Sequence, residues 1–172
     1  MSNMEISNPL LIYGYGNPGR QDDGLGVTLV EELEAWARSE GVVGVAFDSN
    51  YQLNAEDALA VAASRAVVFI DAATEGAKPF EFRPLEPRAE IAFSTHAMSP
   101  ESVLALAAEL YGAKPPAWML AIRGQSWEPG EPPTSAALAN LAAAAAFLRD
   151  WIRRCPMACA TSPAWACPSS AA

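Results

Sequence analysis

The stretch Leu10-Leu11-Ile12-Tyr13-Gly14-Tyr15-Gly16-Asn17-Pro18-Gly19 decides the fold of this 172-residue protein. Its apolar first part, 10–13, is typical of a buried strand, and the glycines after it predict a tight turn. After the turn, apolar residues recur at the spacing of one helix face and predict a helix over 24–39: Leu25, Leu29, Leu33 and Trp36. A strand that passes through a turn into a helix is the repeating unit of an α/β protein.

The rest of the chain alternates strands and helices in the same way. Further strands are expected over 42–47, 66–70 and 118–122, with an edge strand or hairpin arm over 80–83, and further helices over 55–63, 99–111 and 134–154. The pattern predicts a single α/β domain over 1–154, a three-layer sandwich. Its twisted, mostly parallel sheet of about five strands would carry helices on both faces. Because 155–172 are rich in Pro, Ser, Ala and Cys without periodicity, we expect a disordered tail there.

Charge and composition exclude several classes of function. The net charge is -9, from 11 basic and 20 acidic residues, whereas a nucleic-acid-binding protein needs a basic surface. The N-terminus lacks the charge and apolar run of a signal peptide, and the longest apolar stretch, 136–148, is too short to cross a bilayer. We therefore expect a cytoplasmic protein without nucleic-acid or membrane partners. The three cysteines all lie in the predicted tail, and a cytosolic setting argues against a disulfide framework.

Acidic residues come after three of the predicted strands. In α/β sheets ligands bind outside the carboxyl ends of the strands, and the loops there carry Asp22 and Asp23, Asp48, and Asp71. The only histidine, His96, lies in a loop that leads into the predicted helix 99–111. Two carboxylates and an imidazole suit a divalent transition metal with open positions. Each carboxylate also has an ordinary structural explanation, as a helix N-terminal acid or a turn residue, and the residues alone leave this choice open.

A nucleotide site is a second interpretation of the same turn. Gly14, Gly16 and Gly19 fit the dinucleotide-binding pattern G-x-G-x-x-G, and Asp48 ends a predicted strand where a ribose-binding acid would lie. However, Pro18 removes a backbone donor, and two carboxylates would face the pyrophosphate. The charges therefore disfavour this alternative. No Gly-x-Ser-x-Gly motif points to a serine hydrolase.

Three segments in order resemble the hydrogenase maturation endopeptidases, which act on nickel-iron hydrogenase large subunits. They are Gly14-Tyr15-Gly16-Asn17-Pro18-Gly19-Arg20-Gln21-Asp22-Asp23-Gly24-Leu25-Gly26, then Phe69-Ile70-Asp71-Ala72, then Ser94-Thr95-His96-Ala97-Met98-Ser99-Pro100. Shorter likenesses occur at 52–58, 110–112, 122–124 and 127–130, so that the resemblance extends over about 9–154. It implies the same α/β sandwich fold that the strand and helix pattern predicts.

The resemblance also implies an activity and a site. The family's metal-binding and catalytic residues fall on Asp23, Asp71 and His96, and Asn17, Asp22 and Asp48 become candidates for shaping the cleft or contacting substrate. Some relatives carry Glu at the position of Asp23. The metal would be nickel carried by the substrate, or another divalent ion, and the partner a nickel-loaded large-subunit precursor. The reaction would remove the precursor's C-terminal extension after nickel insertion.

Two other functions compete with this one. Peptidyl-tRNA hydrolases share Gly16-Asn17-Pro18-Gly19, but they need a histidine shortly after the motif and a basic face for tRNA, and this chain has neither. A non-catalytic nickel or nucleotide sensor could use the same cleft. Processing of a precursor separates an endopeptidase from both alternatives.

Overall fold

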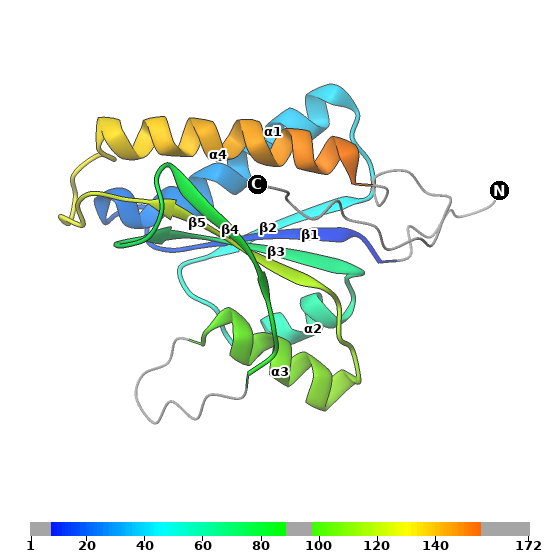
Figure 1. Ribbon diagram of the computed structural model, residues 1–172. Helices are drawn as coiled ribbons and strands as arrows, with labels where there is room; N and C mark the ends of the chain where they lie inside the picture. The colour runs from blue at the N-terminus through cyan, green and yellow to red at the C-terminus, as the bar shows by residue number, and fades with distance from the viewer. Residues whose placement is uncertain (1–7, 89–97, 156–172) are drawn as a thin grey trace.

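Five strands form one sheet in the computed structural model, which describes residues 8–88 and 98–155 (Figure 1). The strands are β1 (Leu10–Tyr15), β2 (Val45–Asn50), β3 (Ala66–Ala73), β4 (Phe80–Leu85) and β5 (Ala117–Arg123). Their order is β2-β1-β3-β5-β4, and all neighbours are parallel except β4, which runs antiparallel to β5 at the edge. The predicted fold class, a mostly parallel α/β sheet, is therefore confirmed.

Helices cover both faces of this sheet. A short 3-10 helix η1 (Gln21–Gly24) leads into α1 (Leu25–Glu40), which lies with α4 (Ser135–Arg154) on one face (Figure 1). Helices α2 (Asp57–Ala62) and α3 (Pro100–Tyr111) lie on the other. The capping residues that helped to predict α3 and α4 are confirmed, because the side chains of Ser99 and Thr134 accept hydrogen bonds from the first-turn amides of these helices.

The central strands are apolar throughout because both of their faces are buried. In β1, Ile12 packs under α1 and α4, whereas the next residue, Tyr13, packs toward α2 and α3. In β3, Val68 and Phe69 divide between the two faces in the same way. This alternation matters for the site, since every second residue at the end of a strand emerges on the same face.

Strand β2 begins later than the sequence predicted. It spans Val45–Asn50 instead of 42–47, because Gly41 ends α1 in a left-handed conformation and Gly44 also has a positive φ of 76°. The parallel register with β1, from Leu10 opposite Val45 to Tyr15 opposite Asn50, then fixes the strand. Asp48 consequently lies inside β2 and not after its end.

Cys155, the first residue of the predicted disordered tail, packs against the protein. That residue comes directly after α4, is buried at 6 % exposure, and donates its amide to the carbonyl of Trp151. The last helical turn therefore keeps it against the protein. The remainder of the predicted tail, 156–172, lies outside the described residues. Across the two described segments, no helix is long and apolar enough to cross a membrane.

Candidate active site

The glycine-rich turn brings the chain after β1 very close to the end of β3. Gly16 has a φ of 129°, and a Cβ there would lie 2.0 Å from the carbonyl oxygen of Asp23. A Cβ on Gly26 would lie 2.4 Å from the carbonyl oxygen of Ile70. Neither position can hold a side chain without moving the backbone, so the two glycines allow η1 and the start of α1 to lie directly on the strand ends.

Asp23 and Asp71 lie on either side of this turn. The Asp23 Oδ2 accepts a hydrogen bond from the Asn17 amide at 3.1 Å, and the Asp71 Oδ1 accepts one from the Ala72 amide at 2.7 Å. A Cβ on Gly16 would also be only 3.8 Å from the Asp71 Oδ1. The structure therefore brings together two of the three predicted metal ligands, from segments far apart in the sequence.

Burial first, and then the negative charge of Asp23, raise the pKa of Asp71 to about 7, although the Ala72 amide and the Tyr15 hydroxyl lower it. Two carboxylates close enough to repel each other favour either a proton or a cation between them. Carboxylate oxygens bind divalent ions, so the Asp23–Asp71 pair fits the nickel or other divalent ion that the resemblance implies.

His96, the third predicted ligand, lies in 89–97, outside the described residues. Within 8–88 and 98–155 no group of three or more His, Cys, Asp or Glu side chains could hold a metal. The complete three-residue metal site therefore stays a prediction.

Asp22 has a different environment from its neighbour Asp23. It is fully buried, and its carboxylate accepts four hydrogen bonds: from the amides of Gln125, Ser126 and Thr134, and from the Thr134 hydroxyl at 2.8 Å. Burial alone would raise the pKa of Asp22, but these donors together lower it. Its oxygens are occupied within the protein, where they tie η1 to the segment between β5 and α4.

The other two predicted substrate contacts lie nearer the surface. Asn17 is exposed, and its Oδ1 accepts the Gly19 amide at 2.9 Å and so closes the turn. Asp48 is exposed in the middle of β2, opposite Tyr13, and its Oδ1 accepts the Ser49 amide. Because β1 separates β2 from β3, Asp48 is not part of the Asp23–Asp71 pair.

A depression of about 230 Å³ lies beside the turn; its lining residues are Gly16, Pro18, Val27, Ser49, Asn50 and Tyr51.

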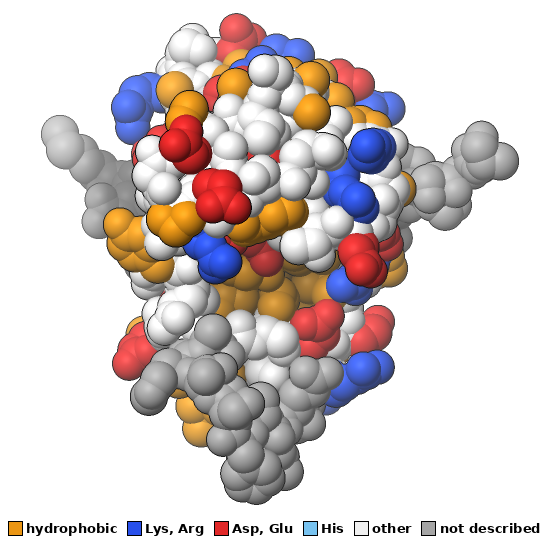
Figure 2. Space-filling model, turned by 90° about the vertical axis from the view of Figure 1, so that its left-hand side faces the viewer, with side chains coloured by type: hydrophobic (Ala, Val, Ile, Leu, Met, Phe, Trp, Pro, Cys, Tyr) orange, Lys and Arg blue, Asp and Glu red, His pale blue; other side chains and the backbone are white. Residues whose placement is uncertain are grey.

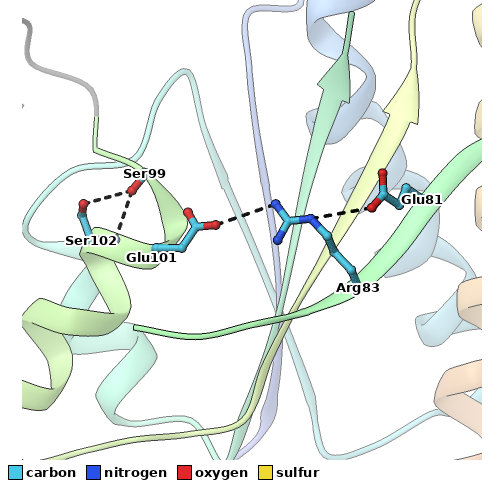
Figure 3. Close-up of polar contacts among 5 residues, drawn as sticks. All are labelled: Glu81, Arg83, Ser99, Glu101 and Ser102. Atoms are coloured by element: carbon cyan, nitrogen blue, oxygen red, sulfur yellow. Dashed lines mark hydrogen bonds and ion pairs between the residues drawn. The ribbon is translucent and has the colours of Figure 1, made fainter. Parts of the chain in front are cut away.

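Three residues near the pair were missed by the sequence analysis: Tyr15, Arg83 and Glu101. Tyr15 lies beside Asp71, whose charge acts on it, and burial raises the pKa of this tyrosine. Arg83 of β4 lies 3.7 Å from Glu101 at the start of α3 and 3.9 Å from Glu81 (Figure 3). The signal for Tyr15 was available, because it falls two residues after Tyr13 and therefore on the same face of the strand.

The face of the molecule at the carboxyl ends of the parallel strands is hollowed. Figure 2 shows hydrophobic side chains at the bottom of the hollow and acidic and basic side chains along its rim. An apolar floor with a few charged groups is a common arrangement for a binding site.

Comparison with known proteins gives matches in structure only. No protein-family model matches the sequence, and no curated protein matches it in sequence. A nickel-iron hydrogenase maturation protease, HycI of Thermococcus kodakarensis, is similar with a TM-score of 0.65 and 23% identity, covering 86% of this chain and 94% of its own. The hydrogenase maturating endopeptidase HybD of E. coli is similar with a TM-score of 0.64 and 21% identity, covering 84% and 92%.

A third similar structure is a hydrogenase 2 maturation peptidase from a thaumarchaeote, with a TM-score of 0.59 and 18% identity over 83% of this chain and 97% of its own. This chain belongs to the class of α/β proteins, with one antiparallel edge strand and a glycine-rich turn at the strand ends. Within that class, this chain has the fold of the nickel-iron hydrogenase maturation proteases, as the sequence resemblance predicted.

Proposed function

We propose that this protein is an endopeptidase that removes the C-terminal extension of a nickel-iron hydrogenase large-subunit precursor after nickel insertion. The observation that carries the proposal is the Asp23–Asp71 pair, held across Gly16 at the end of a sheet with the maturation-protease fold. The reaction would take place in the cytoplasm, on a precursor that already contains its metal.

Each residue has a part in this proposal. Asp23, Asp71 and His96 would hold the substrate's nickel or another divalent ion, which when bound polarises the scissile carbonyl or activates a water. Burial raises the pKa of Asp71 to about 7, so its charged form is costly without a cation, and binding of the ion would displace its proton. Asn17 fixes Asp23 through its amide.

The three other predicted residues, Asn17, Asp48 and Asp22, would have supporting roles. The exposed Asn17 side chain and Asp48 would contact the substrate polypeptide on the surface beside the turn. Asp22, whose oxygens are already hydrogen-bonded, would shape the cleft by holding the neighbouring loop and not by touching the substrate.

A processing assay tests the proposal. Nickel-loaded precursor incubated with the protein should yield a shortened large subunit, and Asp23→Asn, Asp71→Asn and His96→Ala should each abolish the product. Asp150→Asn is a matched control, because that aspartate pairs with Arg154 on the exposed side of α4. Normal processing by the three site variants would contradict the assignment of the site.

Binding without cleavage would indicate a different function. If the wild-type protein bound nickel or the precursor and left the precursor uncut, a non-catalytic sensor would explain the same cleft. Hydrolysis of peptidyl-tRNA to free peptide and tRNA would instead support the hydrolase alternative, against which the net charge of -9 argues.

A further inference from the structure

Tyr15 lies next to Asp71 because of the register between their strands. In the parallel pair β1 and β3, Tyr13 is opposite Phe69 and Gly14 is opposite Ile70, so the next step places Tyr15 beside Asp71. Tyr13, Phe69 and Tyr15 all pack in the apolar cluster under α2 and α3. Tyr15 and Asp71 therefore emerge side by side on one face at the ends of neighbouring strands, with the tyrosine hydroxyl near the carboxylate.

We propose that Tyr15 is a positioning residue for Asp71. Its hydroxyl donates a hydrogen bond that holds the Asp71 carboxylate toward Gly16 and Asp23, in the orientation in which the two acids can share a divalent cation. The inference rests on the proposed function, because it takes Asp71 to be a metal ligand.

Asp71 needs such a partner. Among the described residues its carboxylate has one backbone donor, the amide of Ala72, which is bonded to Oδ1. The charge of Asp23 repels it on the other side of the turn. A carboxylate with one short-range donor and a like charge nearby would turn away, and the bond from Tyr15 opposes that rotation.

The aromatic ring of Tyr15 suits a residue that positions the Asp71 carboxylate. It is partly buried against the cluster under α2 and α3, so its side chain has few alternative positions. Arg83 and Glu101 act electrostatically on Tyr15 with opposite signs, and they are paired with each other at 3.7 Å (Figure 3). Their effects on the tyrosine therefore oppose each other, and the charge of Asp71 acts on it more strongly than either of them.

Tyr13 provides a matched control on the same strand and the same face. Its hydroxyl also donates to an aspartate, the Asp57 Oδ1 at 2.9 Å. Asp57 begins α2 and accepts the Asn54 amide at 2.7 Å, so this bond fixes a helix start and not the strand ends. The variants Y13F and Y15F each remove one tyrosine hydroxyl beside an aspartate, but only one of the two aspartates is in the candidate site.

The first measurement is the affinity of the full chain for Ni²⁺ by calorimetry. We expect Y15F to bind about 10- to 100-fold more weakly than wild type, as is usual when a hydrogen-bond partner of a metal ligand is lost. Y13F should bind within about threefold of wild type, since its aspartate is not a ligand. Equal affinities for Y15F and Y13F would overturn the inference.

The second measurement does not depend on metal binding or on activity. Crystal structures of Y15F and Y13F should show the Asp71 carboxylate rotated away from Gly16 in Y15F and unchanged in Y13F. An unchanged carboxylate in Y15F would overturn the inference even if precursor processing is normal. Conversely, a rotated carboxylate with weakened Ni²⁺ binding in Y15F would support the inference about Tyr15. This holds even if the wild-type protein cuts no precursor, because that result would contradict only the proposed function.

Discussion

Two carboxylates, Asp22 and Asp71, lie close to the same turn and have opposite surroundings. Asp22 is wholly buried among four donors from the segment between β5 and α4. Asp71 is partly buried at the end of β3, with the amide of Ala72 as a donor, Tyr15 beside it and Asp23 as a repelling neighbour. The pKa of the first is lowered and that of the second is raised to about 7.

The difference shows that burial by itself does not decide whether an acid is structural or reactive. Donors around Asp22 replace the water it has lost, so its charge stabilises the loop. Too few donors surround Asp71, so its charged form is costly unless a proton or cation is present. We therefore propose that the carboxylate with a part in the reaction is the one that the protein leaves incompletely satisfied.

Loss of the Asp22 carboxylate should have the largest effect on stability. Asp22→Ala leaves buried amides and a hydroxyl without their acceptor, and we expect the free energy of unfolding to fall by about 4 kcal/mol. Asp23→Ala loses one hydrogen bond and should cost only about 1 kcal/mol. Urea denaturation measures both, and similar costs for the two variants would contradict the contrast between these neighbours.

A side chain at Gly16 should have the next largest effect, because it enters the space between the two acids. Gly16→Ala combines a positive φ with a 2.0 Å contact to the Asp23 carbonyl, and should cost about 3 kcal/mol or more. Gly41→Ala also has a positive φ, but nothing lies within 4 Å of its Cβ, so about 1 kcal/mol is expected. Equal losses in thermal unfolding would show that crowding at the turn is unimportant.

The raised pKa of Asp71 makes a pH-dependent prediction. Between the ordinary value of 3.8 and about 7, the unfolded chain has lost this proton and the folded protein has kept it. Folding therefore takes up a proton there, and wild-type stability should fall relative to Asp71→Asn as the pH rises through this range. Denaturation of both proteins at several pH values with a chelator present checks this. A difference that stays constant from about pH 4 to 8 would contradict the raised pKa.

The smallest effect is expected at the ion pairs near Tyr15. Arg83 is 48% exposed and lies 3.7 Å from Glu101, so Arg83→Gln should change the free energy of unfolding by less than about 0.5 kcal/mol. Arg149→Gln should cost more, about 1 kcal/mol, because Arg149 both pairs with Glu32 and lies over the Trp36 ring. A larger loss for Arg83 would mean that it holds β4 against α3.

Much of the fold could be predicted from the sequence, since apolar periodicity and capping residues are local signals. Ser99 and Thr134 cap the helices that they predicted. The predicted bounds of β2 were wrong because the strand's position depends on pairing with β1, which is not a local property. Cys155 was assigned to the tail because the residues after it are rich in Pro, Ser and Ala, whereas packing of the last turn of α4 buries it.

The candidate site was predicted in part. The strand-end rule and the family resemblance selected Asp23 and Asp71, and the structure places them on either side of Gly16. Tyr15 was missed because a tyrosine at the end of an apolar strand looks like part of the core. The sequence could not divide the work between Asp22 and Asp23, since the donors that occupy Asp22 lie about a hundred residues later in the chain.

The sequence by itself determined the alternation of strands and helices, the glycine turn and the acids at the strand ends. These features depend on backbone conformation and on apolar patterns within a few residues. Only the tertiary structure decided which acid is satisfied and which is not, because hydrogen bonds and repulsion act between segments that folding brings together. The unlike surroundings of Asp22 and Asp71 are the result of that assembly.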